Sequence, residues 1–105
     1  MVKLSVIYQG RPEEPAAFDE HYWSTHLPTV ARWPRIRRIV VSMGEPGDEI
    51  YQICDLYFDT MDDLQAALSS PERKVSLEDS KRFPAFDGHV KRQVFEVREF
   101  GAGSR

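Results

Sequence analysis

The order in which extended and helical patterns follow one another constrains the fold of this chain most strongly. Residues 2–8, VKLSVIY, alternate between two sides, which is typical of a strand with one well-buried face. The composition from Pro15 to about Leu27 predicts a helix, preceded by glutamates that suit the positive end of a helix dipole. Two β-branched segments, RIRRIVVSM from Arg35 and IYQICDLYF from Ile50, flank a turn containing glycine and proline. They therefore predict two antiparallel strands.

The second half of the chain repeats the alternation. Thr60 or Asp59 is expected to cap a helix over DTMDDLQAALSS, and Ser70 a short polar helix that ends near Arg82. The segment HVKRQVFEVREF predicts the last strand, so we expect a single domain over residues 1–100 and a flexible tail over 101–105. The order β-α-β-β-α-β indicates an α+β, ferredoxin-like fold, a four-stranded antiparallel sheet with two helices on one face.

The sheet face opposite the helices is also expected to be covered. On the strand that begins at Ile50, one face carries apolar side chains for the helices and the other is too apolar to remain in water. The first face comprises Cys54, Leu56 and Phe58, and the second Tyr51, Ile53, Asp55 and Tyr57. A second copy packing sheet to sheet would cover the second face, so we predict a homodimer.

Charge and composition exclude several classes of protein. The net charge of −3 in 105 residues, with both signs interspersed, argues against nucleic-acid binding. No apolar run is long enough for a membrane span or signal peptide, and the single cysteine, Cys54, cannot form an internal disulfide, so we predict a cytoplasmic protein. Motifs for dinucleotides, nucleoside triphosphates, α/β-hydrolases and structural zinc are absent from the sequence.

The densest group of chemically active residues is FDEHYWSTHLP, from Phe18 to Pro28. On a helix that advances about 100° per residue, His21 and His26 lie about 140° apart, on opposite shoulders of one face. Metal-binding histidine pairs on a helix normally sit at i and i+4. We therefore expect the two imidazoles not to converge, and we predict neither a metal site nor a cofactor.

Two roles are open for His26. Tyr22 lies four residues earlier, so its phenol could orient the imidazole for acid–base catalysis. Alternatively, His26 could cap the end of the helix, because Pro28 leaves the carbonyl of Ser24 without its usual donor.

Three further residues have alternative roles. Asp55 needs a partner if its sheet face is enclosed, and it serves either in the site or in an ion pair with Arg38 or Arg92. Trp23 is expected to be exposed, as at an interface, and His89 to be an exposed residue at a loop end.

Nearly the whole chain resembles the EthD family, named from ethyl tert-butyl ether degradation, within the dimeric α/β-barrel group. The resemblance covers LSVIY, PAAFDEHYWSTHLP, RIRRIVVS and YQICDLYFDTMDDLQAALSSPE. Its most specific parts are two sets of residues: Phe18, His21, Tyr22, His26 and Pro28, and then Asp55, Tyr57 and Phe58. The resemblance implies a protomer that dimerises through its sheets around a mostly apolar cavity, with family histidines at His21 and His26 and the family's acidic position at Asp55.

The resemblance also implies a degradative or polyketide-type pathway. Our first hypothesis is an enzyme or enzyme-like accessory protein for an apolar cyclic or carbonyl-bearing metabolite. In it His26 transfers a proton, Tyr22 orients His26 and Asp55 tunes the charge, in isomerisation, dehydration or cofactor-free oxygenation, and His21 is a further catalytic candidate. The alternatives are a non-catalytic module that binds a small hydrophobic ligand and, third, a haem-binding protein.

Overall fold

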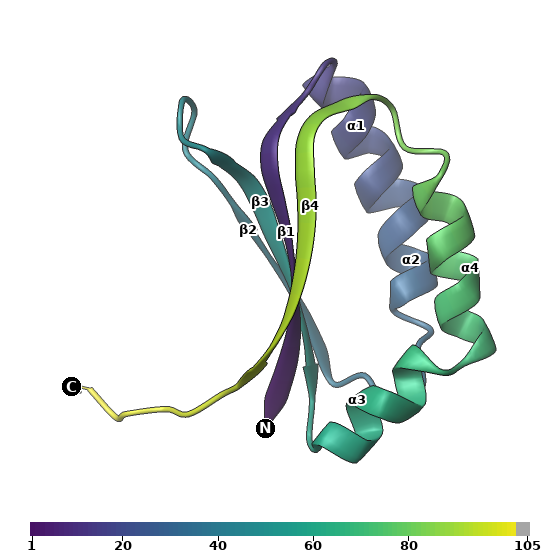
Figure 1. Ribbon diagram of the computed structural model, residues 1–105, viewed down its shortest axis with the longest axis vertical. Coiled ribbons are helices and arrows are strands. Elements are labelled where there is room, and N and C mark those ends of the chain that lie inside the picture. Colours follow the sequence, from purple (N-terminus) through teal and green to yellow (C-terminus); the bar gives the residue numbers. More distant parts are fainter. Residues whose placement is uncertain (103–105) are drawn as a thin grey trace.

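The computed structural model describes residues 1–102, which form one antiparallel sheet and one layer of helices (Figure 1). Four strands build the sheet: β1 (Val2–Pro12), β2 (Arg38–Met43), β3 (Ile50–Phe58) and β4 (Phe86–Glu96). The helical segments are α1 (Pro15–His21), the π-helical turn η1 (Tyr22–His26), α2 (Leu27–Val30), α3 (Met61–Leu68) and α4 (Pro71–Ser80).

The topology confirms the ferredoxin-like prediction. The strand order is β2-β3-β1-β4, every neighbouring pair is antiparallel, and the helices cover one face only (Figure 1). Thr60 and Ser70 cap α3 and α4, each accepting a hydrogen bond from a backbone N–H three residues later. Of the expected tail, residues 101 and 102 have no regular secondary structure, and 103–105 lie outside the described residues.

The pairing of β1 with β4 extends further at one end than the sequence pattern indicates. β1 continues to Pro12, opposite Phe86, and the register places Gly10 directly across from Gly88. Both glycines have positive φ angles, 125° and 152°, and a Cβ atom on either would lie within 2.2 Å of a backbone carbonyl oxygen. The two strands can approach this closely only because neither residue has a side chain.

The sequence pattern predicts that the first helix ends at about Leu27, just before Pro28. In the structure the helix continues beyond Pro28. Leu27 donates its N–H to the carbonyl of Tyr22, five residues earlier, and helical backbone continues through Pro28 to Val30. A proline has no N–H for the i→i−4 pattern, and a π-helical turn changes that pattern locally. His26 therefore lies inside a helix of mixed type and is not its C-cap.

An aromatic cluster fills the core between helices and sheet. Phe18 is 1% exposed, and its ring contacts the rings of five neighbours at centroid distances of 5.5–5.9 Å. These neighbours are Tyr8, Tyr22, Tyr51, Phe83 and Phe86. Phe18 thus joins β1, the first helix, β3 and the segment before β4.

Tyr51 lies on the helix side of the sheet, although the alternating pattern placed it on the other face. The register shifts between Tyr8 and Gln9, which pair with Gln52 and Ile50 and leave Tyr51 as the extra residue of a β-bulge. A bulge interrupts the strict alternation of side chains. Tyr51 consequently packs on Phe18 and donates a hydrogen bond to Oδ1 of Asp19 at 2.8 Å.

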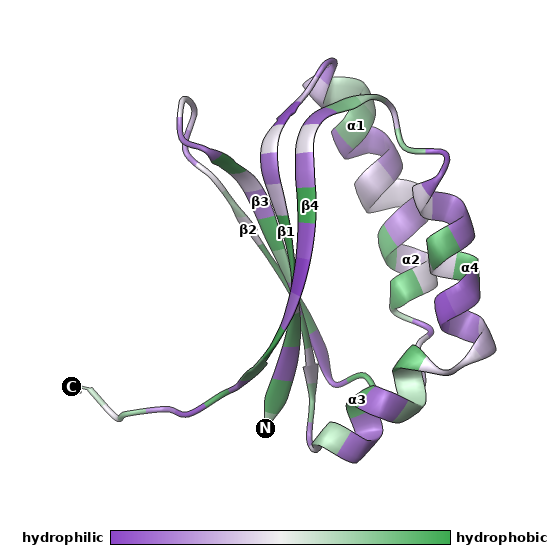
Figure 2. Ribbon diagram, viewed as in Figure 1, coloured by the Kyte–Doolittle hydropathy of each residue, from purple (hydrophilic) through white to green (hydrophobic). Residues whose placement is uncertain are grey.

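No helix covers the opposite face of the sheet (Figure 1), and hydrophobic and hydrophilic residues are mixed along its strands (Figure 2). The register places Ile7 beside Ile53, and Lys3 between Tyr57 and Phe95. We call this the outer face. Among the described residues, no helix has the length and apolar character needed to cross a membrane.

Candidate functional site

Both histidines of the first helical segment meet one carboxylate on α4. Nδ1 of His26 lies 2.9 Å from Oδ2 of Asp79, and Nε2 of His21 lies 3.0 and 3.1 Å from its two oxygens. Asp79 is 4% exposed and His26 8% exposed, whereas His21 is half-buried. The prediction that the two imidazoles diverge is therefore wrong.

The π-helical turn is the physical reason for this convergence. A π-helix turns through a smaller angle per residue than an α-helix, so residues five positions apart lie much closer to one face of the helix. His21 and His26 have this spacing, and η1 occupies the residues between them. The separation of 140° between His21 and His26 holds only for a regular α-helix. The π-helical turn reduces this angle and brings both side chains to the same side of the helix.

The contacts assign the protonation of the pair. A carboxylate can only accept hydrogen bonds, so Nδ1 of His26 donates to Asp79 and Nε2 keeps its lone pair. Burial lowers the pKa of His26, although Asp79 opposes this shift. The pKa of Asp79 is also lowered, because its hydrogen bonds to both histidines outweigh its burial. Near neutral pH the site thus holds an ionised Asp79 and a neutral His26.

His26 borders a cavity of about 50 Å³ between the helix layer and the sheet. Aliphatic side chains form much of its wall, among them Leu4, Val6, Val30 and Leu56. Its polar groups come from Tyr8, Tyr22, His26, Cys54, Arg73 and Arg92, with the indole of Trp33 and two serines of α4. Since Nδ1 is occupied by Asp79, Nε2 is the nitrogen that His26 can offer to a molecule in this cavity.

Tyr22 does not orient His26 through a hydrogen bond. The two rings are neighbours, with centroids 5.4 Å apart and planes tilted by 32°. The Tyr22 hydroxyl instead interacts with Tyr8 and Cys54, and burial raises the pKa of Tyr22 far above its usual value. Burial likewise raises the pKa of Cys54 to about 11 and that of Tyr8 to about 12. All three groups are therefore protonated at neutral pH.

Asp55 does not join this site within the protomer. It lies on the outer face, since its neighbours in the strand, Cys54 and Leu56, face the helices. Its partners are neither Arg38 nor Arg92: Ser5 donates a hydrogen bond to it, and Nζ of Lys3 lies 3.3 Å from Oδ2. A role for Asp55 beside His26 is incompatible with its placement across the sheet.

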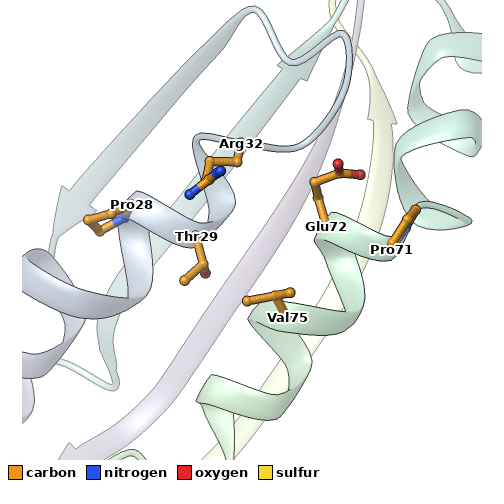
Figure 3. A pocket seen from close by; sticks show the side chains of 6 residues that line it. All are labelled: Pro28, Thr29, Arg32, Pro71, Glu72 and Val75. Carbon is orange, nitrogen blue, oxygen red and sulfur yellow. The ribbon is translucent and has the colours of Figure 1, made fainter.

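A second hollow lies on the surface next to the helix that carries His26. It is an open groove of about 420 Å³ between α2 and α4, lined by six residues (Figure 3). They are Pro28, Thr29, Arg32, Pro71, Glu72 and Val75. A hydrogen bond of 2.8 Å between Thr29 and Ser76 lies between the groove and the cavity, because Ser76 lines the cavity. Several open hollows are larger than the cavity, among them this groove and one of about 520 Å³ beside the turn between β2 and β3, but the buried acid–base pair lies at the cavity.

The sites expected from the sequence fall into two groups. His26 and Tyr22 line the cavity, and His21 lies behind them on Asp79. His89 is exposed, and Trp23 is 51% exposed beside a shallow hollow lined by Leu27 and Ile39. Within residues 1–102, no cluster of three or more His, Cys, Asp and Glu side chains is arranged to hold a metal ion.

Asp79 is the functional candidate that sequence reasoning missed. It lies in a short polar helix, where an aspartate normally faces water. The available signal was its spacing from Ser76, since residues three apart share one helix face, and both side chains are buried. Only the packing of α4 against η1 shows that this polar face points inward.

These features define a class: a ferredoxin-like α+β protein with an aspartate–histidine pair beside a cavity between sheet and helices. The EthD domain model matches residues 11–87. The chain therefore belongs to the EthD family, as its sequence motifs indicated.

Two relatives support this assignment over most of the chain. An EthD family protein from Bacillus halodurans is 33% identical in its crystal structure, with a TM-score of 0.81, covering 93% of this chain and 99% of that one. An uncharacterized 11.0 kDa protein of the thcB-thcC intergenic region of Rhodococcus erythropolis is 32% identical, over 79% of this chain and 84% of its own length.

Two more distant structures share the fold. A dimeric protein of unknown function from Bacteroides fragilis has a TM-score of 0.64 at 19% identity, covering 91% of this chain and 95% of that one. SnoaB, a cofactor-independent oxygenase from Streptomyces nogalater, has a TM-score of 0.69 at 19% identity, with 94% of each chain covered.

Proposed function

We propose that this protein is a proton-transfer enzyme for an apolar cyclic or carbonyl-bearing metabolite, with His26 as the acid–base group. The observation that carries the proposal is the hydrogen bond from Nδ1 of His26 to buried Asp79, which leaves Nε2 free at the cavity. A neutral imidazole with one nitrogen held by a carboxylate is a suitable general base, and the carboxylate stabilises the imidazolium that forms.

The reaction would begin at a carbon next to a carbonyl group. Nε2 of His26 takes a proton from that carbon, and the electrons of the C–H bond move toward the carbonyl oxygen to give an enolate. The imidazolium, stabilised by Asp79, then returns the proton to another carbon, which completes an isomerisation. In a cofactor-free oxygenation the enolate carbon would instead form a bond to molecular oxygen, which is reduced to a peroxide, and the peroxide takes the proton from the imidazolium to give a hydroperoxide. The likeness in fold to a cofactor-independent oxygenase supports this alternative.

The remaining residues would play supporting parts. Tyr22 and Tyr8, both protonated, could donate hydrogen bonds toward the developing enolate oxygen, because both border the cavity. His21 would help to hold Asp79 in position from outside the cavity. We assign Asp55 no part in this chemistry.

We further propose that two copies pair through their outer faces. The protomer covers the apolar side chains of Ile7, Ile53 and Phe95 only in part, and the Bacteroides fragilis protein with this fold is dimeric. A cytoplasmic location stays a prediction from composition. Haem binding stays a third hypothesis, which a Soret band in the purified protein would support.

Proton exchange tests the catalytic proposal. 2-Tetralone, α-angelica lactone and anthrone would be incubated with the protein in D2O, and deuterium incorporation and oxygen uptake measured. We expect His26→Gln to lower any protein-dependent exchange by about 10²- to 10⁴-fold. The control is His89→Gln, an exposed histidine on β4. If exchange survives His26→Gln, the catalytic assignment is lost and the binding-module alternative gains support.

A further inference from the structure

The cavity beside His26 is lined by two arginines and by no carboxylate. Arg73 comes from α4 and Arg92 from β4. Neither forms an ion pair within residues 1–102, although seven ion pairs occur elsewhere in that part of the chain. The cavity wall therefore carries positive charge without an internal counter-charge.

Arg92 is the better placed of the two arginines. It pairs with Val6 in the β1–β4 register, and Val6 packs against the core, so Arg92 lies on the helix side of the sheet. Arg73 is partly engaged, since its Nη1 donates weakly to the carbonyl of Leu68 at 3.4 Å. Arg92 makes no side-chain hydrogen bond among the described residues, so its five N–H donors remain available.

The charge of Arg92 reaches the groups proposed for catalysis. Beside the effect of burial, its charge adds to the fall in the pKa of His26 and opposes the rise in the pKa of Tyr8, as a cation close to both side chains would. A guanidinium beside an apolar wall matches a ligand with one anionic oxygen and a hydrocarbon skeleton.

We propose that the cavity binds an organic anion, with its charged oxygen on Arg92 and its apolar skeleton between the aliphatic wall and His26. The ligand class is thus a metabolite bearing a carboxylate or an acidic enol. This inference specifies the substrate class of the proposed function but requires no catalysis for the binding itself.

The cavity can enlarge without a change of backbone. Arg73 and Leu77 are long side chains that border it, and neither is buried. Rotamer changes of such side chains are common on binding. A ligand larger than about 50 Å³ can therefore enter by displacing these two side chains toward solvent, while Arg92 binds its charged oxygen.

Binding of an anion should also change the protonation of His26. A ligand carboxylate would neutralise Arg92, whose charge lowers the pKa of His26. The pKa of His26 should consequently rise when the anion binds, and by linkage binding should strengthen as the pH falls through that pKa.

The test compares benzoate with benzamide, which has nearly the same shape but no charge. Titrations of the ¹⁵N-labelled protein would follow the Nε–H of Arg92 and the indole N–H of Trp33, which also lines the cavity. We expect benzoate to shift both signals and benzamide to bind at least tenfold more weakly. Arg92→Met should weaken benzoate binding by about tenfold to hundredfold, and Arg92→Lys should restore part of it.

Arg32→Met is the matched control, because Arg32 lies in the surface groove between α2 and α4 (Figure 3). We expect it to leave benzoate affinity unchanged. Equal binding of benzoate and benzamide, no binding of benzoate, or unchanged affinity in Arg92→Met would each overturn the proposal. A larger loss in Arg32→Met than in Arg92→Met would place the anion in the groove and also overturn it.

Two separate measurements distinguish this inference from the proposed function: benzoate affinity in the wild-type protein and Arg92→Met, and proton exchange in the wild-type protein and His26→Gln. If benzoate binds through Arg92 while the wild-type protein shows no proton exchange, the anion site stands and the catalytic proposal falls. If proton exchange depends on His26 but benzoate affinity does not depend on Arg92, the catalytic proposal stands and the anion site falls.

Discussion

Nδ1 of His26 lies 2.9 Å from Oδ2 of Asp79, and this contact joins two helical segments whose residues are 53 positions apart. The same carboxylate also accepts from His21, so one buried charge holds two imidazoles. The pKa of His26 is therefore sensitive to any change in its hydrogen bond with Asp79.

Asp79→Asn should lower the pKa of His26 further, because the ionised carboxylate is the main group that raises it against burial. Loss of hydrogen bonds to a buried charged group should also reduce stability by about 1.5–3 kcal/mol. NMR titration of the imidazole and denaturant unfolding measure the two effects. Asp62→Asn, at an exposed position of α3, is the control and should change neither. A rise in the His26 pKa would contradict this account.

Stability should fall with acid in two windows. His26 has a folded-state pKa below its ordinary value of 6.5, so as the pH falls below about 6.5 the unfolded chain takes up the proton first and stability is lost. Asp79 has a pKa below its ordinary 3.8, so its contribution is lost below about that pH. Thermal unfolding from pH 8 to pH 3 measures both losses. His26→Gln should flatten the first window, and an unchanged first window would count against the assignment.

Phe18→Ala should destabilise the protein by about 3–5 kcal/mol, because it removes the ring at the centre of the aromatic cluster and leaves a cavity. Phe100→Ala is the matched control: Phe100 is 95% exposed, and its loss should cost less than about 0.5 kcal/mol. Urea unfolding of both variants checks the comparison. Equal effects would mean that the packing around Phe18 is not the main source of core stability.

Gln52→Met should raise the melting temperature. Gln52 is 0% exposed, and neither its amide nitrogen nor its oxygen has a hydrogen-bond partner among the described residues. Replacing an unsatisfied buried amide by an apolar side chain of similar shape should stabilise the fold by about 1–3 kcal/mol. Calorimetry measures the change, with Gln65→Met on exposed α3 as the control. A marked loss of stability would show that the amide is satisfied in solution.

Ile53→Asp should convert the proposed homodimer to monomers, because it places a charge at the centre of the outer face, beside Ile7. Light scattering coupled to size-exclusion chromatography gives the mass of each variant. Trp23→Asp introduces the same charge at an exposed position on the helix side and should leave the mass unchanged. A wild-type protein that is monomeric at every concentration would refute pairing through this face.

Local patterns were sufficient for the elements of the fold. Period-two alternation located the strands, and Thr60 and Ser70 marked the starts of α3 and α4, because side-chain caps act within three residues of the chain. Such patterns did not predict where β1 and β4 end or on which face of the sheet Tyr51 lies. They depend on a glycine pair between two strands and on a β-bulge, both of which form only when distant strands pair.

The sequence by itself determined that this chain is an antiparallel α+β domain of the EthD family, and it indicated Tyr22 and His26 as candidate site residues. The tertiary structure alone decided how that site is assembled. The π-helical turn brought His21 and His26 onto one face, the packing of α4 supplied Asp79, and the sheet separated Asp55 from both histidines. Helix type and the contacts between helices depend on the packing of the whole structure. The free-energy difference between an α-helical and a π-helical turn is too small for any single short motif to determine.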